Sequence, residues 1–283
     1  MKMKIISGLL CLLLLSGVCA YFFVGGETSV PEGKFEGPLR VGMECDYAPY
    51  NWQEDKPSDT NVPLANRYGL YAEGYDVQMA KAIAGEMGVE VEIDKVPWNT
   101  LLPALKDKQI DVIISGMADL EERKALPDFS ASLTYNVNVA EYCLVLREDS
   151  RYREGTTLAD FYGARMVGQK GSRLDAVIDQ IPGVNHLTPT ETFSQMLELL
   201  EADKADGIVV DTASAEAFVK EHRGFAMARF ARGQGFNIGF TGICVWTRRS
   251  DKTLLRDINK ALDGIPPETR QRFLDLVQAK VGA

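Results

Sequence analysis

Three segments between residues 39 and 123 decide the fold: LRVGMEC (39–45), GYDVQMAKAIAGEMG (74–88) and VPWNTLLPALKDKQIDVIISG (96–116). The first and third contain apolar, strand-like runs that end in polar, aromatic or small residues. In the second, apolar residues from Val77 to Met87 recur at helical spacing. In open α/β sheets, ligands bind where strand ends meet helix starts. The stretch that closes on Arg123 therefore predicts half of a cleft for a small polar molecule.

The remaining chain repeats the alternation of strand and helix patterns. Strands are expected at 143–146, 164–167, 184–187, 207–210 and 238–246, and helices at 172–180, 191–202, 212–221, 251–262 and 267–281. Residues 51–73 are rich in turn formers and predict an exposed excursion. The alternation favours an α/β protein with largely parallel sheets. A length of 283 residues suggests about two domains.

The charge balance of the chain argues against a nucleic-acid partner. With 31 basic and 40 acidic residues, the formal net charge is −9. A nucleic-acid partner requires a basic surface, so none is expected.

The N-terminus carries an export signal. Lys2 and Lys4 precede an uncharged apolar run from Ile5 to Val24. Residues 1–24 are therefore either a signal peptide cleaved after Val18-Cys19-Ala20 or a retained membrane anchor. A lipid-modified Cys19 is a third reading. All three place the rest of the chain outside the cytoplasm, and the polar residues 25–37 predict a flexible linker.

Outside residues 1–24 the chain has three cysteines, Cys45, Cys143 and Cys244, which are widely spaced. They predict buried thiols rather than a disulfide or metal framework. Because the chain has only His186 and His222, no metal site is expected, and no cofactor is indicated.

Together these segments resemble the family-3 extracytoplasmic solute-binding proteins of ABC-type amino-acid importers. The resemblance covers about residues 38–275, and four motifs carry it: LRVGMECDYAPYNWQ (39–53), GYDVQMAKAIAGEMG (74–88), ISGM (114–117) with Arg123 and DFS (128–130), and GIVVD (207–211). It implies a two-lobed, type II periplasmic-binding-protein-like fold with the ligand cleft between lobes joined by two crossover segments. Lobe 1 would comprise residues 38–134 plus 238–283, and lobe 2 residues 135–237.

By this resemblance, two charged residues clamp an amino-acid zwitterion. Arg123 would hold the α-carboxylate through paired hydrogen bonds that a lysine cannot reproduce. Its alternative is a surface arginine paired with Asp119. Asp211 would accept the α-ammonium, and its alternative is a helix N-cap.

The other site residues also have two readings each. Ser115 and Gly116 would face the ligand or form a tight turn, and Ser172 and Arg173 would offer helix N-terminal N–H groups or only a cap. Tyr47 and Trp98 would sandwich the ligand side chain or pack in the core. Glu44 would pair with a basic side chain or lie in water. Ala118 stands where the family usually has Ser or Thr, so only backbone contact is expected there.

The resulting hypothesis is a non-enzymatic, monomeric protein that binds an amino acid, with polar or basic side chains favoured, and delivers it to a membrane permease. One alternative is a ligand-sensing domain for a membrane signalling partner. Another is a small dehydratase- or transglycosylase-like enzyme with Glu44 as general acid. Which amino acid is bound stays open.

Overall fold

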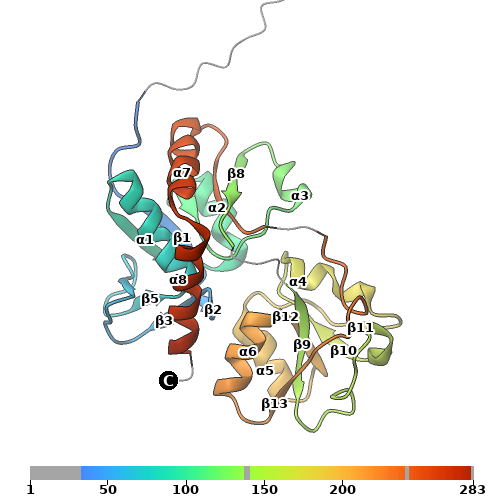
Figure 1. The fold of residues 1–283 in the computed structure, drawn as a ribbon. Helices are drawn as coiled ribbons and strands as arrows, with labels where there is room; N and C mark the ends of the chain where they lie inside the picture. The colour runs from blue at the N-terminus through green and yellow to red at the C-terminus, as the bar shows by residue number, and fades with distance from the viewer. Residues whose placement is uncertain (1–32, 137–140, 240–241, 282–283) are drawn as a thin grey trace, which may run out of the picture. The chain divides into compact units, whose positions relative to one another are not determined.

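Two five-stranded sheets organise the protein, shown in Figure 1 as a computed structural model that describes residues 33–136, 141–239 and 242–281. The first sheet has the order β6-β1-β7-β14-β8 and the second β11-β10-β12-β9-β13. The predicted leader (1–24) and residues 25–32 of the linker lie outside the described residues. Among the described residues, no helix combines the length and apolar character needed to cross a membrane.

In the first sheet, strand β1 lies parallel to both of its neighbours. Its members are β1 (Leu39–Met43), β6 (Val91–Lys95), β7 (Val112–Ile113), β8 (Phe129–Thr134) and β14 (Cys244–Arg248). β1 pairs in parallel with β6 and β7, whereas β14 is antiparallel to β7 and β8.

The second sheet has the same mixture of strand directions. It contains β9 (Tyr142–Arg147), β10 (Arg165–Val167), β11 (Asn185–His186), β12 (Gly207–Asp211) and β13 (Phe225–Ala228). β10 is parallel to β11 and β12, and β9 is antiparallel to β12 and β13.

The expectation of largely parallel sheets is therefore wrong in part. Both β9 and β14 enter their sheet after the chain has passed over from the other sheet. No βαβ crossover within one sheet fixes the direction of these two strands, so they can run against their neighbours.

Helices cover the sheets, most of them at predicted places, whereas η2 was not predicted. Around the first sheet lie η1 (Trp98–Thr100), α1 (Tyr75–Met87), α2 (Leu101–Lys106), α3 (Glu121–Lys124), α7 (Lys252–Gly264) and α8 (Pro267–Lys280). Around the second lie η2 (Leu158–Phe161), η3 (Ile178–Gln180), α4 (Arg173–Ala176), α5 (Phe193–Glu201) and α6 (Thr212–Glu221). The helical spacing from Val77 to Met87 is confirmed, because Val77, Ala80, Ile83, Ala84 and Met87 are all buried in α1.

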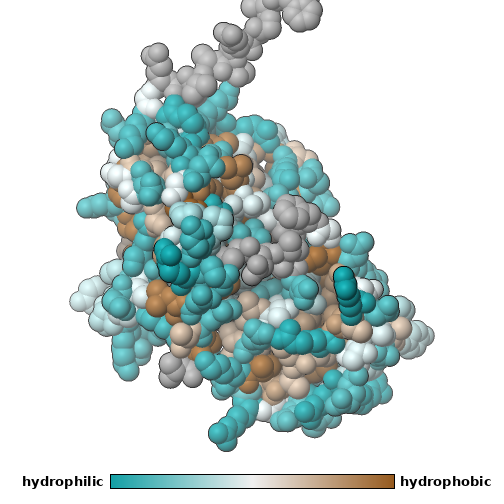
Figure 2. All heavy atoms as spheres, viewed as in Figure 1, coloured by the Kyte–Doolittle hydropathy of each residue, from teal (hydrophilic) through white to brown (hydrophobic). Residues whose placement is uncertain are grey.

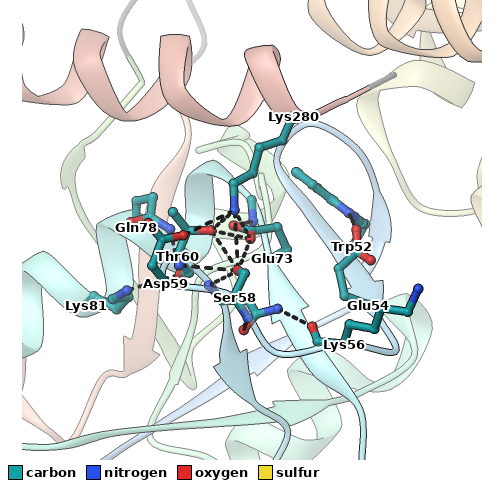
Figure 3. A network of polar contacts seen from close by, with 12 residues as sticks. Trp52, Glu54, Lys56, Ser58, Asp59, Thr60, Glu73, Gln78, Lys81 and Lys280 are labelled. Atoms are coloured by element: carbon teal, nitrogen blue, oxygen red, sulfur yellow. Dashed lines mark hydrogen bonds and ion pairs between the residues drawn. The ribbon is translucent and has the colours of Figure 1, made fainter. Parts of the chain in front are cut away.

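The excursion at 51–73 is more ordered than its composition indicates. With β2 (Asp46–Tyr47) it forms a small sheet, β2-β3-β5-β4, from β3 (Asn51–Glu54), β4 (Val62–Pro63) and β5 (Tyr71–Glu73). Figure 3 shows the reason: Lys280 at the end of α8 reaches into this segment. Its ammonium lies 3.1 Å from the buried Glu73 carboxylate and also contacts Thr60.

The interior is divided between the two sheets. The largest core cluster packs α1, α7 and α8 on the β1 side, and two further clusters lie around β9, β10 and β12. Cys45, Cys143 and Cys244 are buried free thiols, as predicted. Charged and polar side chains cover most of the face in Figure 2, with small apolar patches between them.

Candidate functional site

All ten residues predicted for the site line a single cavity. They are Glu44, Tyr47, Trp98, Ser115, Gly116, Ala118, Arg123, Ser172, Arg173 and Asp211. Six residues that were not predicted line it as well: Tyr50, Asn136, Tyr142, Gln169, Leu174 and Ile243. The structure thus brings together side chains from both sheets and from the segments between them.

Two neighbouring parallel strands supply the part of the wall that carries the carboxyl group of Glu44. Glu44 follows β1, and Ser115 follows β7, so both lie at the carboxyl edge of the first sheet. The Glu44 backbone N–H donates to the Ser115 hydroxyl oxygen at 3.0 Å. This bond joins the two strand ends, as expected for a ligand site in an α/β sheet.

The Tyr47–Tyr50 turn packs closely against Gly74, the residue that precedes α1. Gly74 has φ 128°, and a Cβ atom there would lie 2.3 Å from the Tyr50 carbonyl oxygen. Only glycine allows this close approach. Asn51 accepts from the Cys45 N–H at 2.8 Å and donates to the Asp76 carboxylate at 2.7 Å.

Asp76, the acid of the GYD motif, is fully buried and ties this turn to other parts of the site. It accepts from the Tyr135 hydroxyl at 2.9 Å and from the Gly116 backbone N–H. Burial raises its pKa to about 7, although these hydrogen bonds offset part of the shift. The motif therefore positions Gly116, which lines the cavity, together with the aromatic turn.

Arg123 is a buried cation whose guanidinium meets no acid. It is 8% exposed, and it donates to the carbonyl oxygens of Ala118 at 2.7 Å and Gly171 at 3.1 Å. No carboxylate of the described residues lies within ion-pair distance of it, and Asp119 pairs instead with Lys124 at 3.2 Å. The surface-arginine alternative is therefore wrong. Burial lowers the pKa of Arg123 to about 10.

Trp98 contacts both the Arg123 guanidinium and residues of the apolar core. The Arg123 guanidinium carbon lies 5.7 Å from the centre of the Trp98 ring and 5.9 Å from that of Trp246. Trp98 also packs against the apolar cluster around α2. The core-packing reading of Trp98 therefore holds in part, and the ring also lines the cavity.

Asp211 at the end of β12 is a helix N-cap whose carboxylate also lines the cavity. Oδ1 accepts from the Ser214 N–H at 3.0 Å and so caps α6, while the Tyr47 hydroxyl donates to Oδ2. The Tyr50 hydroxyl also donates to Oδ1 at 3.4 Å. The helix N-cap is real, and it holds the carboxylate in the cavity wall with its second oxygen against Tyr47.

The segment before α4 contributes Ser172 and Arg173. The Ser172 hydroxyl accepts from the Asp175 N–H at 3.3 Å, so the cap reading applies to its side chain. Arg173 donates to the Ile238 carbonyl oxygen at 2.7 Å. Its Nε is buried without a hydrogen-bond partner among the described residues. A buried N–H without an acceptor is rare in folded proteins and is available to a ligand or a water.

Glu44 does not lie in water. It is 5% exposed, and its Oε1 accepts from the Gln169 side-chain N–H at 2.5 Å. Burial, with repulsion from Asp46, raises the pKa of Glu44 to about 8. The strand-end alternative for this residue is therefore wrong.

The residues that were missed differ in how visible they are in the sequence. Tyr50 belongs to the same turn as Tyr47, and Gln169 and Leu174 flank the predicted Ser172 and Arg173, so widening these motifs finds three of them. Asn136, Tyr142 and Ile243 lie next to the segments that pass between the sheets. No local pattern marks them, because their place in the cavity depends on how those segments run.

The sequence of this chain is similar to those of known proteins. The family model described as "Bacterial extracellular solute-binding proteins, family 3" matches residues 39–274. The arginine-binding extracellular protein ArtP of Bacillus subtilis (strain 168) is 29% identical, and the alignment covers 89% of this chain and 90% of that protein. The L-cystine-binding protein TcyJ of Escherichia coli (strain K12) is 26% identical over 91% of this chain and 88% of its own length.

Solved structures resemble this fold. The arginine-bound form of truncated ArgBP from T. maritima has a TM-score of 0.66 and 28% identity. That likeness covers 81% of this chain and 97% of the other. The predicted α/β fold class is confirmed.

Proposed function

The chain belongs to the bacterial extracellular solute-binding proteins of family 3, and on that premise we propose that its cavity binds a free amino acid and delivers it to the permease of an ABC importer. The proposal agrees with relatives named for arginine and cystine. The family's extracellular place fits the charged, apolar N-terminal run.

The observation that carries the proposal is that Arg123 and Asp211 line the same cavity. Arg123 is a buried guanidinium that no acid of the described residues neutralises, and Asp211 is a buried carboxylate. A buried charge without a counter-ion is costly. The α-carboxylate and α-ammonium of a zwitterion would supply the missing charges to each. The orphan Nε of Arg173 offers a further donor to an anionic group.

The rest of the cavity favours a polar or basic side chain. Glu44 and Gln169 present carboxyl and amide groups, and Tyr47 and Trp98 present aromatic rings. Aromatic faces attract cations and cover aliphatic stems. Ala118 adds no side-chain hydrogen bond, and its carbonyl oxygen already accepts from Arg123.

A thermal-shift screen with each of the twenty amino acids tests the proposal. Ligand at about 1,000 times its Kd adds roughly 4 kcal/mol to the free energy of unfolding. At least one amino acid should raise the melting temperature of the wild type. The same amino acid should leave the melting temperature of the Arg123→Met variant unchanged. No shift with any of the twenty would sink the proposal.

The partner and the oligomeric state form a separate part of the proposal. We expect a monomer in light scattering. We expect crosslinking in whole cells to capture a permease, and capture of a signalling protein instead would favour a sensor. No turnover of the bound amino acid is expected, because the proposed role is binding and release.

A further inference from the structure

Glu44 and Gln169 meet across the cavity from different sheets. Glu44 follows β1, and Gln169 follows β10, 125 positions later. Gln169 is 4% exposed, and its Nε2 donates to Glu44 Oε1 at 2.5 Å and to the Glu191 carbonyl oxygen at 3.4 Å. Both side chains line the cavity. Together they form a hydrogen-bonded polar pair in the cavity lining.

The charges around Glu44 leave it without an ion-pair partner among the described residues. From β2, Asp46 repels its negative form, while Lys95 at the end of β6 attracts it. The Lys95 ammonium, however, contacts the Cys45 carbonyl oxygen at 3.4 Å and the Gln53 side-chain oxygen at 3.1 Å.

Beside Gln169, the charged side chains of Lys170 and Glu191 already form an ion pair with each other. The ammonium of Lys170 lies 2.9 Å from the Glu191 carboxylate, whose other oxygen accepts from Asn99. Gln169 itself is neutral, so the group closest to Glu44 across the cavity brings a dipole and no charge.

This environment favours the neutral acid. Burial, and then repulsion from Asp46, raises the pKa of Glu44 to about 8, although the bond from Gln169 and attraction by Lys95 offset part of the shift. At pH 7 about nine in ten molecules then hold the Glu44 proton. A cationic side chain placed against Glu44 would reverse this preference, because a nearby opposite charge stabilises the carboxylate.

Resting on the proposed function, we infer that Glu44, oriented by Gln169, selects the ligand's side chain according to its own protonation. As the neutral acid, Glu44 donates its O–H to an uncharged side-chain amide. It pairs with a cationic side chain only after its proton has passed to solvent. Binding of a basic amino acid thus releases one proton, and binding of an amide amino acid releases none.

The linkage has a definite sign, and the pKa of about 8 sets its approximate size. For L-arginine, the affinity follows the ionised fraction of Glu44 and rises about 50-fold from pH 6 to pH 8. For L-glutamine it follows the protonated fraction and falls about twofold over the same range. The two probes carry the same α-amino and α-carboxyl groups, so the difference between them reports on the side chain alone.

The test is calorimetric titration of the full-length chain, kept in mild detergent because of its apolar N-terminal run, with L-arginine and L-glutamine at pH 6, 7 and 8. Two buffers of different ionisation enthalpy count the protons. Arginine should release about 0.9 proton per site at pH 7, and glutamine should release none. In Glu44→Gln, arginine should lose both the proton release and the pH dependence, and glutamine should lose its twofold pH dependence.

Asp94→Asn is the matched control. Burial raises the pKa of Asp94 as well, but this side chain does not line the cavity, so the proton release should persist in the variant. The inference is overturned by an arginine affinity that is flat between pH 6 and 8, or by proton release that survives in Glu44→Gln. Binding of neither probe also overturns it, whereas the proposed function fails only if none of the twenty amino acids binds.

Discussion

The Asp46 carboxylate accepts two hydrogen bonds from Ser194, one from the backbone N–H at 3.1 Å and one from the hydroxyl at 2.6 Å, although 148 positions separate the residues. Asp46 lies on β2 of the small sheet, and Ser194 is the second residue of α5, beside the second sheet. A carboxylate at a helix N-terminus is stabilised by the free N–H groups and the helix dipole. This contact fastens α5 to the turn that carries Tyr47.

We predict that Asp46→Ala weakens ligand binding about fivefold, because the bound state loses a cap that connects the two walls of the cavity. A double-mutant cycle with Ser194→Ala, read by calorimetry, should show that the second substitution adds little to the first. Asp55→Ala, an exposed acid that does not line the cavity, is the control and should leave the affinity unchanged. Strictly additive effects would show that the pair does not act as a unit.

Arg123→Met should abolish binding without unfolding the protein. The substitution removes the paired donors for a carboxylate and also a buried charge that costs stability, so the affinity should fall at least about 100-fold while the unliganded melting temperature holds or rises. Thermal denaturation with and without ligand measures both. A fall in the unliganded melting temperature by more than about 5 °C would mean that Arg123 is needed mainly for folding.

Ala118→Ser should tighten binding. A hydroxyl at this position of the cavity wall can donate to a ligand oxygen, and one added hydrogen bond gives about fivefold in affinity. Ala125→Ser, on the exposed end of α3, is the control and should have no effect. Weaker binding by Ala118→Ser would show that the cavity has no room for the hydroxyl.

Asp76 should make stability pH-dependent. Its pKa is about 7 in the folded protein, against 3.8 for an ordinary aspartate. The folded state therefore holds an extra proton between these pH values. The contribution is fully present below pH 4 and is lost as the pH rises through 7, a decline on the order of 4 kcal/mol. Urea unfolding from pH 4 to 8 gives the free energy of unfolding of the wild type and of Asp76→Asn. The stability of the wild type relative to the variant should fall by this amount as the pH rises. A constant difference would contradict it.

The Lys280–Glu73 contact in Figure 3 should matter more than an exposed ion pair. Glu73 is 2% exposed, and removing its cation leaves a buried carboxylate uncompensated. We expect Lys280→Ala to lower the free energy of unfolding by about 3 kcal/mol. Lys106→Ala, which breaks the exposed pair with Asp128, should cost less than about 1 kcal/mol. Equal losses in the two variants would show that burial of Glu73 gives the pair no special weight.

The local pattern of the chain predicts the elements that bury one face along a regular repeat. The spacing from Val77 to Met87 defines α1, and the apolar runs at 39–44 and 207–210 become strands of two sheets. The prediction fails for residues 51–73. Their turn formers are compatible with strands once Lys280 and α8 cover Glu73, and a contact more than 200 positions away leaves no trace in local composition.

Some residues of the site can be predicted from local motifs, and others cannot. Motif resemblance identifies Arg123 and Asp211, because the residue types that clamp a zwitterion lie in recognisable segments. Gln169 was missed, since its role depends on Glu44, 125 positions earlier, lying within 2.5 Å of it.

By itself, the sequence determined the α/β class, the family resemblance and ten residues that line one cavity, because periodicity and motifs are local properties. Only the tertiary structure decided the antiparallel course of β9 and β14, the small sheet under α8, and the protonation of Glu44 and Asp76. The strand directions depend on where the chain passes from one sheet to the other, and the small sheet and the two raised pKa values depend on which distant residues cover a group. Both are properties of the assembled fold.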